Sequence, residues 1–290
     1  LLIINDRLKP RQVYDVGEML RPFGIQVWDR IDLILKLFAK HAKTAEAKLE
    51  IELASVRHMG PRIFGMGMEL SRQGGGTGAR GIGETNSERM KRHLKEKERR
   101  IKKKLKKFEG GRSLIRQGRR RKGLKTVSIV GYTNAGKTTL LNALTGRKEY
   151  TANELFATLD TRVGQLFLPG SSSTALISDT IGFIKDLPPE LLNAFASTLS
   201  EAVEADLLVQ VVDASDKDYQ KHIVVVDEIL ERLGLTETPR ILAFSKIDAI
   251  NKQSIKEIDE LFKDTPHVFV SSQKRLGLDD LISEIESSLL

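Results

Sequence analysis

Apolar and polar residues alternate in a pattern that predicts two short strands and a helix at the start of the chain. Residues 1–5 form a strand-like apolar run, residues 11–20 repeat with a helical period, and residues 24–28 form a second strand-like run. A strand, a helix and a strand at this spacing predict a parallel β-α-β unit. Because neither a turn nor a cap precedes the first strand, we expect this unit to be part of a larger subdomain.

The next segments predict two long helices. Between residues 30 and 57, apolar side chains recur at three- and four-residue steps, which is the period of one helical face. Residues 84–108 repeat in the same way, and Ser87 is placed to cap this second helix. The two apolar stripes suit pairing as an antiparallel hairpin. The second stripe consists of Met90, Leu94, Ile101, Leu105 and Phe108.

From Lys125 onward the pattern changes to strands that alternate with helices. Apolar runs at residues 126–130, 175–178, 240–244 and 267–270 predict strands. Strands alternating with helical segments are typical of an α/β domain with a largely parallel sheet.

A length of 290 residues suggests about two domains. We place the boundary where the helical pattern gives way to alternating strands and helices. The first domain is residues 1–122, comprising a partial α/β subdomain (1–29), a helical hairpin with a glycine-rich loop (30–110) and a linker (111–122). The second domain is residues 123–290.

Composition excludes several classes of protein. The chain has no Cys, which excludes a disulfide scaffold and thiolate metal or redox sites. No apolar run reaches the roughly 18 residues needed to span a bilayer, so we expect no membrane partner. Aromatic residues make up only 6% of the chain, which argues against a broad surface for stacking bases. The lack of Cys fits a reducing compartment, so we expect a cytoplasmic protein. We also expect it to be a monomer.

The net charge of +8 is distributed unevenly along the chain. Residues 1–83 carry a net charge of +4, residues 84–122 carry +13, and residues 123–290 carry −9. A strongly basic middle beside an acidic end indicates a polyanionic partner for the middle segment and a different task for the end.

A glycine-rich stretch precedes the basic helix. Six of the ten residues from Gly74 to Gly83 are glycine, a density that disfavours regular structure. Arg72 and Arg80 flank a backbone whose N–H groups can donate to phosphates. The stretch is therefore either a phosphate-binding loop or a passive flexible linker.

From Ser87 to Phe108, the helix that follows carries twelve cations and three anions, whereas an ordinary solvated face mixes both signs. Each contact of a cation with a phosphate releases counterions, so this surface should bind nucleic acid with a steep salt dependence. Such contacts do not by themselves read a base sequence. The candidate RNA-binding residues are Arg72, Arg80, Arg89, Lys91, Arg92, Lys95, Arg99, Lys102, Lys103 and Lys106.

A phosphate-binding motif follows the first strand of the second domain. Residues 131–139 read GYTNAGKTT, which matches GxxxxGK[ST] with a strand before it and a helix after it. Backbone N–H groups of this loop close around phosphates, Lys137 supplies charge to the β- and γ-phosphates, and the Thr138 hydroxyl can bind Mg²⁺. The candidate nucleotide-binding residues here are Gly131, Tyr132, Thr133, Asn134, Ala135, Gly136, Lys137, Thr138 and Thr139.

Two later segments supply groups for the γ-phosphate and its metal ion. Asp179 ends a strand and can hold Mg²⁺ through water, while the Gly182 N–H can meet a γ-phosphate. Thr158 lies in the intervening loop and can close on Mg²⁺. The candidate metal ligands are Thr138, Thr158 and Asp179. The candidate catalytic residues are Lys137, Thr158 and Gly182.

The remaining motifs select guanine. In Ser245-Lys246-Ile247-Asp248, the carboxylate of Asp248 can accept hydrogen bonds from the N1–H and the exocyclic amine of guanine. Adenine offers no such pair of donors. Ser271 and Ser272 follow the next strand and can complete the base pocket. Five motifs in this order, each at a strand end, predict a GTPase domain that uses GTP as substrate and Mg²⁺ as cofactor.

The motifs together resemble the HflX family of GTPases, in the Obg–HflX branch of translation-associated G proteins. The resemblance covers essentially the whole chain. It implies an α/β fold in which a Ras-like P-loop GTPase domain is preceded by a partial α/β subdomain with a long basic helical hairpin. It rests on GGGTGARGIGET at residues 74–85, on Asp29-Arg30 followed by Leu33-Ile34-Leu35, and on Phe156-Ala157-Thr158-Leu159-Asp160.

The resemblance also implies a partner and a role. The partner would be the ribosome, chiefly its large subunit and the RNA of that subunit, and the role would be dissociating stalled or idle ribosomes under stress. Two alternatives remain open. One is an RNA-binding assembly or anti-association factor in which bound nucleotide is structural, and the other is an ATP-using RNA remodeller.

Three residues depart from related patterns. Ser245 stands where the family usually has Asn, and Ile82 stands where it commonly has Pro. Phe183 stands where Ras-like proteins place the Gln that orients water, and a Phe side chain cannot orient water by hydrogen bonding. We therefore expect slow intrinsic hydrolysis, on the order of 10⁻⁴–10⁻² s⁻¹, that a partner accelerates.

Overall fold

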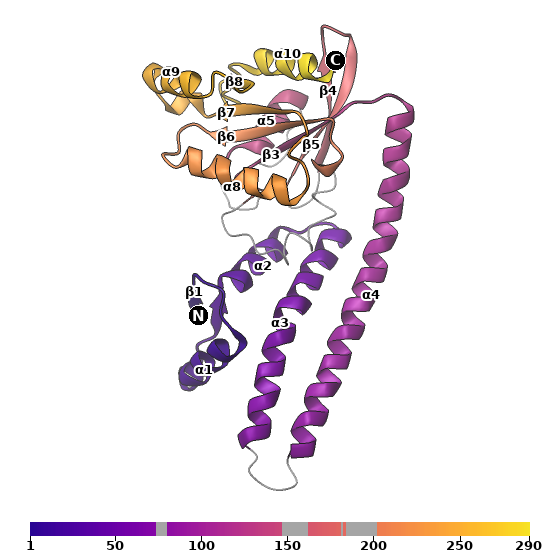
Figure 1. Ribbon diagram of the computed structural model, residues 1–290, viewed down its shortest axis with the longest axis vertical. Coiled ribbons are helices and arrows are strands. Elements are labelled where there is room, and N and C mark those ends of the chain that lie inside the picture. Colours follow the sequence, from indigo (N-terminus) through magenta and orange to yellow (C-terminus); the bar gives the residue numbers. More distant parts are fainter. Residues whose placement is uncertain (74–79, 147–161, 181, 184–201) are drawn as a thin grey trace. The chain divides into compact units, whose positions relative to one another are not determined.

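A computed structural model describes residues 1–73, 80–146, 162–180, 182–183 and 202–290; for residues 61–73, 80–87, 115, 116, 120 and 162 it describes the backbone alone (Figure 1). The described residues form two compact units that divide between Gly111 and Arg112. Their helices and strands are β1 (Leu2–Ile4), α1 (Pro10–Leu20), η1 (Arg21–Phe23), β2 (Val27–Asp29), α2 (Arg30–His41), α3 (Ala45–Gln73), α4 (Arg80–Arg121), β3 (Thr126–Gly131), α5 (Lys137–Thr145), β4 (Arg162–Leu168), β5 (Ser173–Asp179), β6 (Leu207–Asp213), α8 (Tyr219–Arg232), β7 (Arg240–Ser245), η2 (Ile247–Ala249), α9 (Lys252–Leu261), β8 (His267–Phe269) and α10 (Leu278–Leu289).

The first unit begins with the predicted β-α-β arrangement. Strands β1 and β2 pair in parallel, with Leu2 opposite Val27, and α1 connects them. The second strand begins at Val27 rather than at Gly24, because a short 3₁₀ turn precedes it. Gly24 closes that turn in the left-handed conformation, with φ of 65°.

A buried polar cluster fixes the junction of β2 and α2. Asp29 is fully buried and caps α2, because its carboxylate accepts the N–H of Asp32 at 2.9 Å. The Asp32 carboxylate in turn accepts the N–H of Asp29 at 3.1 Å, which completes a reciprocal cap. His58 of α3 places its Nε2 3.3 Å from a carboxylate oxygen of each aspartate. This contact ties the start of α2 to α3.

The single helix predicted over residues 30–57 is wrong. The chain leaves the helix at Ala42, whose ψ of 115° is extended, and re-enters one at Ala45. The Thr44 hydroxyl accepts the N–H of Ala47 at 3.2 Å, as a helix N-cap does. Apolar periodicity continues across the break and therefore could not reveal it.

Helices α3 and α4 form the predicted hairpin. Leu53, Val56 and Ile101 are buried where the two helices meet, and three half-buried leucines pack against them, confirming this part of the apolar stripe. Two ion pairs cross between the helices beside this seam. They join Arg57 to Glu98 at 3.0 Å and Lys97 to Glu52 at 2.9 Å.

Helix α4 is longer than predicted at both ends. It begins at Arg80, so Ser87 lies inside the helix and is not its cap, and the glycine-rich stretch is helical from residue 80 onward. It continues to Arg121, so the linker predicted at 111–122 is almost entirely helical. Glycine costs a helix only about 1 kcal/mol each relative to alanine, and no proline interrupts this segment. In the described part of the chain, no helix combines the length and apolar character needed to cross a membrane.

The second unit is built on a six-stranded sheet with the order β4-β5-β3-β6-β7-β8. The strands pair in parallel, except that β4 runs antiparallel to β5. Strands β3 and β6 at the centre are buried along almost their whole length, as expected for a sheet covered on both faces. The four strands predicted by the sequence are therefore confirmed as β3, β5, β7 and β8.

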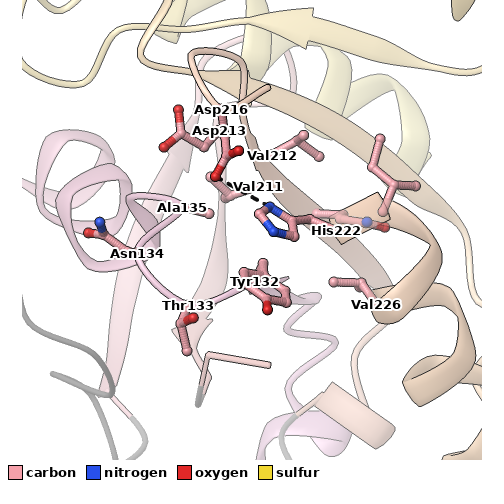
Figure 2. A pocket seen from close by; sticks show the side chains of 12 residues that line it. Tyr132, Thr133, Asn134, Ala135, Val211, Val212, Asp213, Asp216, His222 and Val226 are labelled. Carbon is pink, nitrogen blue, oxygen red and sulfur yellow. Dashed lines mark ion pairs between the residues drawn. The ribbon is translucent and has the colours of Figure 1, made fainter. Parts of the chain in front are cut away.

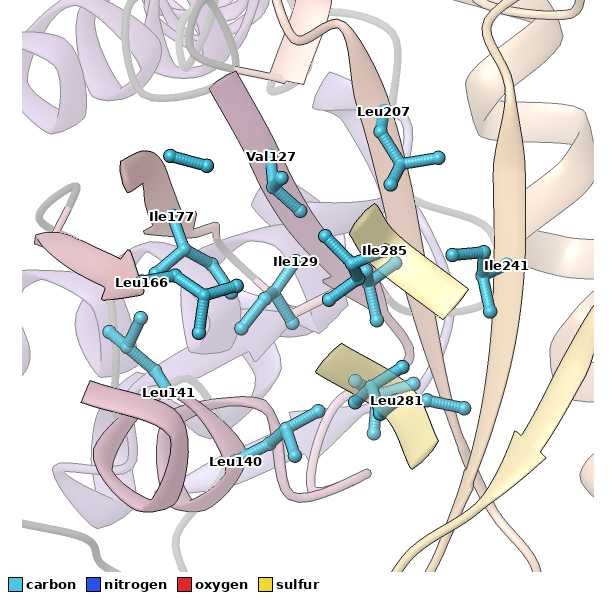
Figure 3. Close-up of a cluster of buried hydrophobic side chains, with 14 of the residues drawn as sticks. Val127, Ile129, Leu140, Leu141, Leu166, Ile177, Leu207, Ile241, Leu281 and Ile285 are labelled. Carbon is cyan, nitrogen blue, oxygen red and sulfur yellow. The ribbon is translucent and has the colours of Figure 1, made fainter. Parts of the chain in front are cut away.

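Two hydrophobic clusters hold helices against the two faces of this sheet. On one face, Leu140 and Leu141 of α5 and Leu281 and Ile285 of α10 pack against residues such as Ile129 (Figure 3). On the other face, α8 and α9 contribute buried isoleucines to a cluster around Phe244. The carboxyl ends of the parallel strands lie along one edge, where open α/β sheets bind ligands.

Candidate nucleotide-binding site

The phosphate-binding loop connects β3 to α5 and needs glycine at two positions. Gly131 has φ of 147°, and a Cβ there would collide with the carbonyl oxygen of Val211 in β6. Gly136 has φ of 94° and is the N-cap residue immediately before α5. Residues with a side chain rarely adopt these φ values, so the backbone of the loop favours glycine at both positions.

Lys137 lies buried within this loop. Its Nζ donates to the carbonyl oxygens of Tyr132 at 2.8 Å and of Gly131 at 3.2 Å. Burial lowers the pKa of Lys137 to about 8, and the nearby negative charge of Asp179 partly opposes this shift. The ammonium group thus lies against the backbone of the loop, where phosphate oxygens would compete with the two carbonyl oxygens for its hydrogen bonds.

We expect nucleotide affinity to depend on pH through Lys137. Phosphates bind the charged ammonium, so affinity should be flat below pH 8 and fall by about tenfold per unit as the pH rises above it. Calorimetric titration with GDP between pH 7 and 9 measures this slope. Lys137→Arg, which stays charged throughout, is the control with a flat profile. A wild-type profile as flat as that of the control would contradict this role.

Two oxygen donors lie where a metal ion is expected. The Thr138 hydroxyl donates to the Asp179 carboxylate at 2.7 Å, and Asp179 is fully buried at the end of β5. Hard oxygen ligands of this kind fit Mg²⁺, which also keeps several waters and binds phosphate oxygens. Thr158, the third predicted ligand, lies outside the described residues.

Gly182 and Phe183 lie directly against the phosphate-binding loop. The Phe183 N–H donates to the carbonyl of Gly131 at 3.0 Å, and its carbonyl accepts the N–H of Thr133 at 2.8 Å. A Cβ on Gly182 would lie 2.9 Å from the Cα of Thr133 and 3.0 Å from the Nζ of Lys137, so only glycine allows this approach. The Phe183 side chain is 1% exposed and packs in the interior, where it contributes no polar group.

The predicted guanine-reading residues come together at the ends of β7 and β8. The Ser271 hydroxyl donates to the Asp248 carboxylate at 2.6 Å, and this bond lowers the pKa of Asp248. An ionised Asp248 is the form that accepts two hydrogen bonds from guanine. Ser272 follows in the same turn and is half-buried.

Ser245 ties the base-reading segment to the phosphate-binding loop despite its short side chain. Its hydroxyl lies 2.6 Å from the carbonyl oxygen of Ala135 and 3.1 Å from that of Val212. Ser245 is itself buried. The Ser245 hydroxyl therefore makes the hydrogen bond to the phosphate-binding loop that the Asn of other family members is expected to make.

Sequence reasoning missed Asp213. Its carboxylate accepts a hydrogen bond from Lys246 Nζ at 2.6 Å and also binds the hydroxyl and N–H of Ser215. Lys246 has a left-handed φ of 59°, and the ion pair holds its long side chain in place. The available signal was an Asp at the end of β6, the same position that Asp179 occupies on β5.

The basic residues predicted to bind RNA are placed on the outside of α4, except that the side chains of Arg72 and Arg80 lie outside the described residues. The exposed ones are Arg89, Lys91, Arg92, Lys95, Arg99, Lys102, Lys103 and Lys106. Lys102 forms an ion pair with Glu98 at 2.9 Å, which neutralises part of its charge. The surface is strongly basic, and nothing in the geometry selects a base sequence.

The sheet order, the phosphate-binding loop and the Ser271–Asp248 pair are those of a P-loop GTPase domain, which is the fold of the second unit. Residues 126–246 match the family model described as 50S ribosome-binding GTPase, and residues 41–119 match that of the GTP-binding GTPase middle region. The chain belongs to the HflX family of GTPases.

Individual relatives support this assignment. The GTPase HflX of Caldanaerobacter subterraneus subsp. tengcongensis is 43% identical over 100% of this chain and 65% of its own length. The GTPase HflX of Escherichia coli is 40% identical over 100% of this chain and 67% of its own length. The chain thus spans about two thirds of the length of these relatives. Among solved structures, this chain is similar to the crystal structure of a GTP-binding protein from Sulfolobus solfataricus in complex with GDP. The two sequences are 28% identical, the match covers 99% of this chain and 80% of the Sulfolobus chain, and the TM-score is 0.56.

Proposed function

We propose that this chain binds GTP and hydrolyses it to GDP with the help of Mg²⁺. The observation that carries the proposal is the convergence of Lys137, the Thr138–Asp179 pair and the Ser271–Asp248 pair at the carboxyl ends of one sheet. Lysine and the loop N–H groups suit the phosphates, the oxygen pair suits the metal ion, and Asp248 suits guanine. The GDP bound by the similar protein from Sulfolobus solfataricus supports the same choice of base.

We propose that the partner is the large ribosomal subunit, and that GTP-dependent binding splits stalled or idle ribosomes under stress in the cytoplasm. Support for a ribosomal partner comes from the family model, whose description is 50S ribosome-binding GTPase. Support for contact with RNA comes from the exposed basic face of α4. In such a cycle GTP orders the segments around Gly182, and hydrolysis releases the protein.

A second candidate function is an RNA-binding assembly or anti-association factor in which the nucleotide is structural. The observation that favours it is Phe183, whose side chain is buried and cannot orient an attacking water. In that case the basic helix would suffice for activity and GTP turnover would be incidental. The two candidates differ in whether ribosome splitting requires an intact nucleotide site.

We predict that the basic face of α4 sets the salt dependence of ribosome binding. Lys103, Lys106 and Lys107 are exposed and lie at i, i+3 and i+4, on one side of the helix. Reversing all three to Glu should weaken binding to purified large subunits and lower the slope of log affinity against log salt by about 1 for each lost phosphate contact. Sedimentation at several salt concentrations measures both quantities.

The control carries the same change of charge elsewhere. Lys252, Lys256 and Lys263 are exposed on or beside α9, and their reversal to Glu changes the net charge equally. This variant should retain the wild-type salt slope. An unaltered slope in the α4 variant would show that the basic helix does not contact the ribosome.

A further inference from the structure

An aromatic pair joins the phosphate-binding loop to helix α8. The rings of Tyr132 and His222 stack with centroids 3.8 Å apart and an interplanar angle of 9° (Figure 2). His222 Nδ1 lies 3.7 Å from a carboxylate oxygen of Asp216, in the loop between β6 and α8, and the dashed line in Figure 2 marks this pair. The histidine ring thus lies beside this loop and places its flat face against the tyrosine ring.

Tyr132 is connected to both groups that we expect to face the γ-phosphate, Lys137 and Gly182. Its carbonyl oxygen accepts the Nζ of Lys137 at 2.8 Å. Tyr132 also forms a parallel bridge with Phe183, the residue that follows Gly182. A rotation of the Tyr132 backbone would therefore displace Lys137 and also weaken the bridge to Phe183.

The stacked rings border a small cavity. A cavity of about 50 Å³ is lined by Tyr132, His222 and Val226, among others, and by the buried side chain of Gln210. The Gln210 Nε2 has no hydrogen-bond partner within the described part of the chain, whereas its Oε1 accepts a hydrogen bond from Arg240 at 2.8 Å. The stack with His222 therefore contributes to the orientation of the Tyr132 ring.

We propose that His222 is a positioning residue for GTP binding and hydrolysis, acting through Tyr132 to fix the conformation of the phosphate-binding loop. The inference rests on the proposed GTPase function. Among the described residues, His222 contacts Tyr132 and Asp216 and forms no hydrogen bond or ion pair with Lys137, Thr138 or Asp179.

Removing the histidine ring tests this role. His222→Ala should weaken GDP and GTP binding by roughly two- to tenfold, the range expected from losing one aromatic stack, and should lower kcat as well because Lys137 is less well held. His222→Phe keeps a flat ring and should restore affinity to within about twofold of wild type. Lys221→Ala, one residue away on the exposed side of α8, is the matched control and should bind as wild type does.

The measurements separate positioning from mere folding. Affinity is measured calorimetrically with GDP well below the melting temperature, and the melting temperature is measured without nucleotide. A loss of affinity in His222→Ala that His222→Phe recovers supports the proposal. Equal losses in both variants, or wild-type affinity in His222→Ala, would overturn it. If the wild-type protein binds no GDP, the proposed GTPase function fails instead.

Discussion

Replacing Lys137 with Ala should remove GTP binding and, with it, any ribosome splitting. The buried ammonium is the one cation that the described structure places within the phosphate-binding loop, and it is already held there by two carbonyl groups. Losing a buried, hydrogen-bonded charge opposite phosphates costs about 2–5 kcal/mol, or roughly 30- to 5,000-fold in affinity. Calorimetric titration with GTP measures this loss, and a ribosome-splitting assay measures its consequence.

The same variant separates the two candidate functions. Lys125→Ala, which removes an exposed lysine just before β3, is the control and should behave as wild type. A melting curve close to that of wild type would show that the Lys137→Ala variant is folded. If that folded variant still splits ribosomes without binding GTP, the nucleotide is structural and the switch mechanism is wrong.

Replacing Asp248 with Asn should destroy the preference for guanine nucleotides. The carboxylate accepts two hydrogen bonds from guanine, whereas an amide oxygen with a neighbouring NH₂ group cannot accept both. Hydrogen bonds to a charged group contribute about 1.5–3 kcal/mol each, so GTP affinity should fall by at least roughly tenfold while ATP affinity stays weak. Competition titrations with GTP and ATP measure the ratio of the two affinities.

The affinities of the Asp248→Asn variant for different bases show whether the loss of GTP affinity comes from base recognition. Xanthine carries a carbonyl where guanine has its exocyclic amine, so xanthosine triphosphate should bind the Asp248→Asn variant better than it binds the wild type. Asp259→Asn, an exposed carboxylate on α9, serves as the control. An unchanged ratio of GTP to ATP affinity in Asp248→Asn would refute the base-reading role.

The second unit was predictable because its strands are buried on both faces. Such strands appear as continuous apolar runs, of which β3 and β7 are clear examples, and each run ends in a motif with definite chemistry. The pairing of Asp248 with Ser271 and of Thr138 with Asp179 follows once parallel strands end at one edge. Even the substitution at Ser245 was interpretable, because a hydroxyl can donate to the same loop as an amide.

The features that were missed depend on contacts between distant segments or on weak local signals. The break before α3 is made by the Thr44 cap inside an unbroken apolar period. The extension of α4 was missed because each glycine costs a helix only about 1 kcal/mol and no proline lies between residues 80 and 121. The stack of Tyr132 on His222 and the Asp213–Lys246 pair join residues that periodicity treats as unrelated.

The most direct test of the account is GTP turnover measured with and without purified large ribosomal subunits. Alone, the protein should hydrolyse GTP slowly, on the order of 10⁻⁴–10⁻² s⁻¹, because Phe183 is buried and cannot orient water. With saturating large subunits the rate should rise on the order of 10³-fold, and Lys137→Ala should show no turnover in either condition. A rate that large subunits leave unchanged would contradict the proposal of a ribosome-dependent GTPase.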